Sequence, residues 1–162
     1  MNTKVEIKEN ALAIKQLLDG WRYMRETDVL VGIPQEKNAA REDGVTNAEL
    51  LYIHTNGSPI NGIPARPTIE PGINSPDAKP VIQRLLGETA QAAITGNIPK
   101  AKASQQKAGM VGANAAKAVF GSDQLAPLKP ATIARRNKNS AAPLVDTAAL
   151  RNAVTYVIRK KG

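Results

Sequence analysis

The sequence of 162 residues contains no cysteine and a single histidine, His54. Disulfides and thiolate metal sites are therefore excluded, and a lone histidine gives no zinc or two-metal ligand spacing. We expect neither a metal nor a cofactor. His54 stands beside Tyr52 and Ile53 in a short predicted helix, where we interpret it as a packing or surface residue and not as a base.

The sequence also lacks the patterns that usually accompany catalysis. Its glycines form neither a phosphate-binding GxxxxGK[ST] loop nor a dinucleotide-binding GxGxxG turn. No serine has the setting of a nucleophile elbow, and the scattered acidic residues do not pair on one helix face. We expect no catalytic residues and predict that the protein is not an enzyme.

Aromatic residues are scarce, at 3% of the chain, whereas hydrophobic residues make up 42%. The core must therefore be built from Leu, Ile, Val and Ala, and it will be thin. A thin core indicates a domain that depends on partner subunits. So few aromatic side chains also argue against base stacking on single-stranded nucleic acid.

No apolar run is long enough to span a bilayer, and the first ten residues, MNTKVEIKEN, lack the apolar core of a signal peptide. We expect no membrane association. With no cysteine in the chain, a cytosolic folding compartment is the simplest interpretation.

What the sequence has is positive charge, and it is unevenly distributed. Residues 1–97 contain 10 Lys/Arg and 12 Asp/Glu, whereas residues 98–162 contain 12 Lys/Arg and 2 Asp/Glu, for a formal net charge of +8. This asymmetry indicates that the C-terminal part meets a polyanion or an acidic partner. A solvated basic surface is the alternative.

The pattern of apolar residues predicts a single α+β domain over residues 1–162. A small mixed or antiparallel sheet, with strands near 28–33, 67–70 and 153–159, should pack against two longer helices. We expect a helix over 8–25 with one apolar stripe (Ile14, Leu17, Leu18, Trp21 and Met24), a capped helix after Thr46, and a helix from Ser75 to Gly96. Residues 97–125 form an alanine-rich segment, helical over about 101–120, and residues 126–162 a basic C-terminal part.

A proline-rich stretch, GIPARPTIEPGI, covers Gly62 to Ile73 with three prolines in twelve residues. Prolines at this spacing exclude a regular helix and predict a stiff, extended segment. Because its backbone is fixed in advance, such a segment loses less entropy on docking. Arg66 would be held ready for a carboxylate or phosphate. The alternative is a stiff crossover whose arginine pairs with its own chain.

Two motifs stand in a characteristic order: IPARP at Ile63–Pro67, and LVDTAALR at Leu144–Arg151, with VLVGIP and NAELLYIHTNGSP before them and LKPATIARR between. Together they resemble the tail-component family of tailed bacteriophages, which includes neck, tail-completion, minor tail and virion-morphogenesis proteins. The resemblance covers residues 28–95 and 126–159. The chain departs from the pattern at Thr68, where the family commonly has Phe, and at Ala148, where it commonly has Gly.

The resemblance implies a structural virion protein at the head–tail junction, a neck or tail-completion ring subunit assembled in the host cytoplasm. Its partners would be further copies of itself, the head connector or stopper, and tail-terminator or tail-tube proteins. Genomic DNA would be contacted non-specifically through phosphates. Two alternatives remain open: a tail-terminator protein that caps the tail tube, and a stand-alone, sequence-independent nucleic-acid-binding protein.

Three groups of residues are candidates for these roles. In the proline-rich stretch, the subunit-interface candidates are Pro64, Arg66, Pro67 and Ile69. The candidates for lining a DNA channel or binding an acidic partner are Lys129, Arg135, Arg136 and Lys138. They would contact phosphates, and the alternative is that they are solvated charges of an exposed loop. Asp146 is predicted to cap the short helix in which Leu150 is the core anchor.

Overall fold

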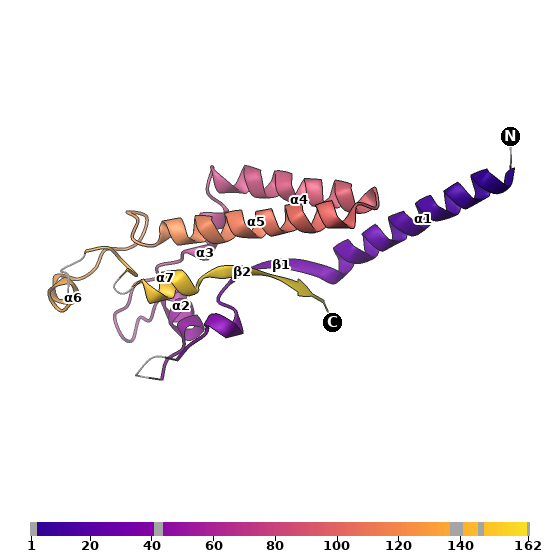
Figure 1. Cartoon of the computed structure of the whole chain (residues 1–162). Helices are drawn as coiled ribbons and strands as arrows, with labels where there is room; N and C mark the ends of the chain where they lie inside the picture. The colour runs from indigo at the N-terminus through magenta and orange to yellow at the C-terminus, as the bar shows by residue number, and fades with distance from the viewer. Residues whose placement is uncertain (1–2, 41–43, 137–140, 146–147, 162) are drawn as a thin grey trace.

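The structure, a computed structural model of the chain, describes residues 3–40, 44–136, 141–145 and 148–161. It is an α+β fold, as predicted. The first helix, α1 (Thr3–Glu26), runs directly into the strand β1 (Thr27–Gly32). Its N-terminal end projects well away from the rest of the molecule (Figure 1).

The sheet has two antiparallel strands, β1 and β2 (Thr155–Lys160), so the predicted outer strands are confirmed. The register places Val31 opposite Tyr156 and Leu30 opposite Val157. Because side chains alternate across a strand, these two pairs point to opposite faces. Val31 and Tyr156 contact helix α5 (Ile98–Val119), whereas Leu30 and Val157 are exposed.

The strand predicted near 67–70 is wrong. That stretch enters a one-turn helix, α3 (Ile69–Ile73), with Thr68 at its N-cap position. Pro71 lies in the first turn of this helix, where its missing backbone N–H leaves no hydrogen bond unmade. Gly72 follows, and a side chain there would overlap the backbone of Ala115 and Ala116 in α5.

Two long helices, α4 (Ala78–Ile94) and α5, form an antiparallel hairpin whose turn contains Gly96 in a left-handed conformation (φ 77°). Helix α5 is the centre of the fold, since it packs against α3, α4 and both strands. The alanine-rich segment predicted over 97–125 is therefore a core helix over Ile98–Val119. Gly109 and Gly112 permit close contact with Tyr156 and Val31, and a side chain at Gly109 would overlap the Tyr156 ring.

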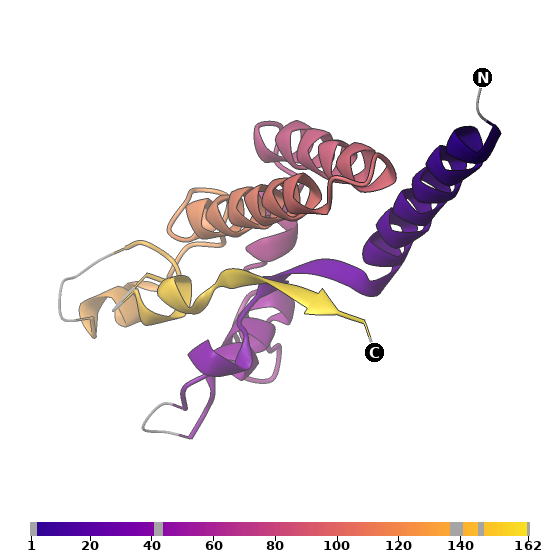
Figure 2. The ribbon, with the colours of Figure 1, turned by 45° about the vertical axis from the view of Figure 1, so that its right-hand side comes forward.

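The remaining helices are short and lie at the end of the molecule opposite the start of α1 (Figures 1 and 2). A 3₁₀ turn, η1 (Gln35–Lys37), precedes α2 (Asn47–Asn56), which begins with the predicted Thr46–Glu49 capping box. Helices α6 (Pro130–Ala134) and α7 (Ala149–Ala153) complete this end. The main apolar cluster lies here, and its buried members are Leu51, Ala116, Val119, Phe120, Leu125, Leu144, Leu150 and Val154.

Helix α1 packs against α4 mainly through small residues. Tyr23 and Met24 cover an alanine cluster at Ala92, Ala93 and Ala101, and Gly20 lies directly against the carbonyl of Ala93. Most of the predicted apolar stripe does not contact α4. Only Met24 of its members turns inward, and the others remain exposed to solvent.

Candidate functional site

The proline-rich stretch crosses from α2 to α3, and a hydrogen bond holds its backbone to α2. The backbone N–H of Arg66 donates to the carbonyl of His54, in the last turn of that helix. Just before it, Ser58 and Ile63 pair in a tight antiparallel bridge. Residues 63–67 therefore lie outside any helix and are held to α2, as predicted, whereas the last five residues of the stretch, Ile69–Ile73, form the helix α3, so the prediction that its prolines exclude a helix is wrong there.

Arg66 points inward and is only 5% exposed. Its Nε donates to the carbonyl oxygen of Ala126 at 2.7 Å, and its Nη2 donates to that of Pro127 at 2.8 Å. Burial, together with the nearby positive charge of Arg136, lowers the pKa of Arg66 from its ordinary value. The guanidinium thus ties the proline-rich stretch to the loop that follows α5.

This geometry matches the alternative in which the arginine pairs with its own chain, and it leaves Arg66 poorly placed to clamp a neighbouring subunit. Of the other interface candidates, Pro64 is exposed, Pro67 is half-buried and Ile69 packs against the main apolar cluster. A role of Pro64 or Pro67 in an interface stays a prediction.

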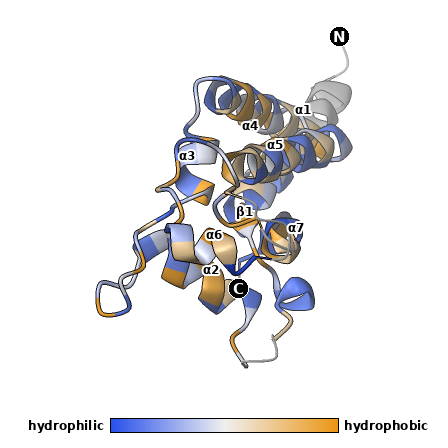
Figure 3. Ribbon diagram, turned by 90° about the vertical axis from the view of Figure 1, so that its left-hand side faces the viewer, coloured by the Kyte–Doolittle hydropathy of each residue, from blue (hydrophilic) through white to orange (hydrophobic). Residues whose placement is uncertain are grey.

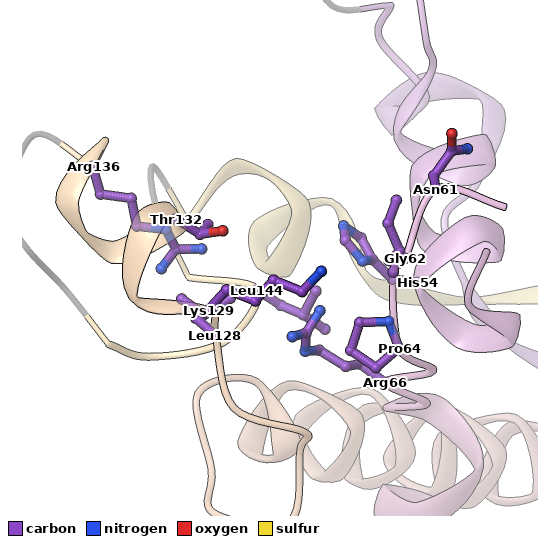
Figure 4. A pocket seen from close by; sticks show the side chains of 11 residues that line it. His54, Asn61, Gly62, Pro64, Arg66, Leu128, Lys129, Thr132, Arg136 and Leu144 are labelled. Carbon is purple, nitrogen blue, oxygen red and sulfur yellow. The ribbon is translucent and has the colours of Figure 1, made fainter. Parts of the chain in front are cut away.

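A cavity of about 290 Å³ lies where the two motifs meet (Figure 4). Its wall comes from α2, the proline-rich stretch, the region of α6 and the start of the second motif. The lining residues are His54, Asn61, Gly62, Ile63, Pro64, Arg66, Leu128, Lys129, Thr132, Arg136 and Leu144. The described wall thus combines three basic side chains with polar and apolar ones, and two of the basic ones, Arg66 and Arg136, donate to carbonyls of their own chain.

The predicted basic residues do not form one uniform surface. Lys129 and Arg135 are exposed, and Lys129 borders the cavity whereas Arg135 does not line it. Arg136 is half-buried, and its Nη1 donates to the carbonyls of Ala142 (2.7 Å) and Val145 (3.1 Å). Arg136 therefore ties the end of α6 to Ala142 and Val145. Lys138 and the predicted cap Asp146 lie outside the described residues.

Arg151, in the second motif, is exposed, and its Nε donates to the carbonyl of Lys117 near the end of α5. Leu150, one residue earlier, is buried in the main cluster, as predicted. Ala148 has a left-handed backbone (φ 60°), a conformation that glycine adopts without the steric cost of a Cβ.

Two exposed apolar surfaces have no counterpart among the predicted site residues. One is the outer stripe of α1, which consists of Ile14, Leu17, Leu18 and Trp21. The other lies on α2, where Tyr52 is 71% exposed. The stripe itself was visible in the sequence as a spacing of three and four residues. The spacing does not state which side of the helix meets the body, and Gly20, Tyr23 and Met24 supply that side.

The chain matches no family model, no curated protein and no solved structure. Among the described helices, none combines the length and the hydropathy that a membrane span requires. The described residues also contain no group of three or more His, Cys, Asp or Glu side chains that could hold a metal ion.

Proposed function

We propose that the protein is a structural subunit of the head–tail junction of a tailed bacteriophage, a neck or tail-completion protein that works by assembly. The observation that supports this most is the outer stripe of α1. Leu18 and Trp21 are 58% and 60% exposed on a helix that projects from the body. A protein that works alone has little reason to leave such side chains in water, because contiguous exposed apolar surface usually marks an interaction site.

The order of the two sequence motifs supports the same proposal. IPARP and LVDTAALR are separated by more than seventy residues, yet both contribute to the wall of one cavity, through Ile63, Pro64 and Arg66 on one side and Leu144 on the other. Their resemblance to the tail-component family thus concerns residues that belong to one part of the fold.

The charge distribution indicates which residues would contact DNA in this function. The whole excess of positive charge lies in residues 98–162, since residues 1–97 have more Asp/Glu than Lys/Arg. Lys129 and Arg135 are exposed at the α6 end of the molecule. In a junction that a genome passes through, such side chains would contact phosphates without reading sequence.

Sedimentation velocity on the full chain over a wide concentration range tests the proposal, with electron microscopy of the heaviest species. We expect concentration-dependent self-association into closed rings. A strict monomer that binds duplex DNA tightly and with strong salt dependence would contradict the proposal and favour the stand-alone nucleic-acid-binding alternative.

A further inference from the structure

The outer stripe of α1 is defined by Ile14, Leu17, Leu18 and Trp21, all exposed. It does not face α4, because Gly20 and Tyr23 make the contact with the body from the neighbouring side of the helix, and Met24 lies at the border between the two sides. At 100° per residue, the stripe positions follow one another along a single side over two turns. An apolar ridge of this length on a projecting helix suits a groove on another molecule.

Basic side chains border this ridge on one edge. Lys15 and Arg22 are seven residues apart, so they lie on the same side of the helix, next to Leu18, and both are exposed. If α1 paired with α1 of a second copy in antiparallel fashion, the two basic edges would lie together. A parallel pair would set them against apolar Leu17. The acid beyond this edge, Asp19, already pairs with Arg22 of its own helix at 3.5 Å, so the charges favour a different surface.

The structure offers a surface of the right kind on α2. A shallow apolar groove of about 720 Å³ runs along this helix, and Glu49 is the acidic side chain among the described residues that line it. Its walls are Gly44, Val45, Ala48, Glu49, Tyr52 and Ile53. Figure 3 shows hydrophobic ribbon segments on α2. The stripe and the groove are thus both apolar, and their edges carry opposite charges, Lys15 and Arg22 on one and Glu49 on the other. Arg22 also pairs with Asp19, and one carboxylate oxygen of Glu49 accepts from Thr46 in the capping box, so docking would have to compete with these local contacts.

The two surfaces lie at opposite ends of the molecule in both views (Figures 1 and 2). One chain therefore cannot bring its own α1 stripe to its own α2 groove. Contact between two different patches on identical chains is head-to-tail, and such contacts build closed rings when the rotation between copies closes.

We propose that the outer stripe of α1 in one copy docks into the α2 groove of the next copy, with Lys15 and Arg22 facing Glu49. This inference rests on the proposed assembly function and names the contact that makes it. The occupant is a second copy of this chain. A paired α1 helix is the other occupant that the test separates directly, and a mixed disulfide at background level with no homodimer would leave the stripe to a lipid surface or an unrelated protein.

The absence of cysteine makes disulfide trapping clean, because any introduced thiol is the only one in its chain. Leu18→Cys and Tyr52→Cys chains are purified separately, mixed, oxidised and separated on a non-reducing gel. We expect a mixed disulfide between the two chains to be the main product. The matched control mixes Leu18→Cys with Ile60→Cys, a 98% exposed apolar residue outside the groove, and should give background only.

A mixed disulfide at the level of the control overturns the docking inference, and so does a dominant homodimer of Leu18→Cys, which would indicate α1 pairing. Loss of the mixed product on adding Arg22→Glu to the Leu18→Cys chain supports the charge pairing. Sedimentation of the unmodified chain separates the two proposals. Self-association without the mixed disulfide leaves the assembly function standing, whereas a strict monomer removes both.

Discussion

At the scale of single residues, Arg66 explains why a stiff apolar stretch contains a cation. A buried charge is stable only when it is hydrogen-bonded, and Arg66 has two backbone carbonyls within 2.8 Å. Prolines on both sides limit the backbone conformations of the unfolded stretch, so less entropy is lost in holding the side chain there. The stretch serves as a brace between α2 and the loop after α5.

Replacing this arginine should therefore detach the proline-rich stretch from the loop after α5. We expect Arg66→Ala to lower the free energy of unfolding by about 3 kcal/mol, because hydrogen bonds to a charged group are removed and two carbonyls are left without their donor. Urea denaturation followed by circular dichroism measures this. Arg135→Ala, at an exposed site, should stay within about 0.5 kcal/mol of the parent. A variant Arg66→Ala with unchanged stability but impaired assembly would instead favour the subunit clamp.

A second residue, Ala148, holds a conformation that suits glycine. Its φ of 60° lies in the left-handed region, which costs a residue with a Cβ about 1–2 kcal/mol. Glycine loses more backbone entropy on folding, by roughly 0.5–1 kcal/mol, so the two effects partly offset each other. We expect Ala148→Gly to raise the stability by about 0.5 kcal/mol in the same urea experiment. Ala149→Gly, in the helix that follows, should lower it, and equal effects at both sites would contradict the argument.

At the scale of elements, the contact between α1 and α4 depends on the absence of a side chain at Gly20. A Cβ at this position would overlap the carbonyl oxygen of Ala93. Alanine is the better helix former by about 1 kcal/mol, but the overlap is with backbone, which cannot rotate away. Steric exclusion should therefore dominate.

We expect Gly20→Ala to loosen α1 from α4 and lower the thermal midpoint, with increased hydrogen exchange over α1. Gly87 is the matched control, since it is an exposed glycine in the same helix pair and an added Cβ meets nothing within 4 Å. Gly87→Ala should raise stability by up to about 1 kcal/mol. A stabilising effect of both substitutions would mean that α1 does not rest on α4 as described.

The elements differ in how far the sequence could predict them. Strands near 28–33 and 153–159 carry dense β-branched and apolar runs, and the Thr46–Glu49 capping box is a local signal, so both were predicted correctly. The strand predicted at 67–70 is wrong because Pro67 and Ile69 suit an extended strand as well as they suit a helical turn. The hydrogen bonds from Gly72 to Thr68 and from Asn74 to Glu70 decide for a helical turn, and they depend on packing against α5.

The candidate site was less predictable than the fold. Spacing identified the α1 stripe but not its exposure, because exposure depends on Gly20 meeting Ala93, which is distant in the sequence. The sequence also does not decide between the two alternatives for Arg66. Its acceptors are backbone carbonyls, and a carbonyl has no signature in the sequence.

At the scale of the whole molecule, the fold separates three kinds of surface. The α1 arm carries the apolar stripe at one end, the α2 groove lies at the other end, and the exposed basic residues Lys129 and Arg135 lie beside α6 at that same end (Figure 1). Arg66 and Arg136 are part of the structure, since both donate to carbonyls of their own chain. Any contact with DNA therefore falls to the exposed members.

Because only Lys129 and Arg135 are exposed beside α6 among the described basic candidates, we can predict how the chain binds DNA. We expect the full chain to bind random-sequence duplex DNA weakly, with affinity that falls steeply as salt rises. Lys129→Gln with Arg135→Gln should reduce the slope of log K against log salt by about 2, one unit for each phosphate that the variant no longer neutralises. Fluorescence anisotropy at several salt concentrations measures the slope.

The matched control removes the same charge elsewhere. Lys100→Gln with Lys102→Gln changes the net charge equally, at exposed sites in the first turns of α5, the end of that helix remote from α6. If the basic residues beside α6 face the DNA path, only the first pair should flatten the slope, because counterion release depends on the number of phosphates neutralised and not on total charge. Equal effects of both pairs would mean that the charge acts as a general solvated surface. No binding even at low salt would assign Lys129 and Arg135 to an acidic protein partner instead.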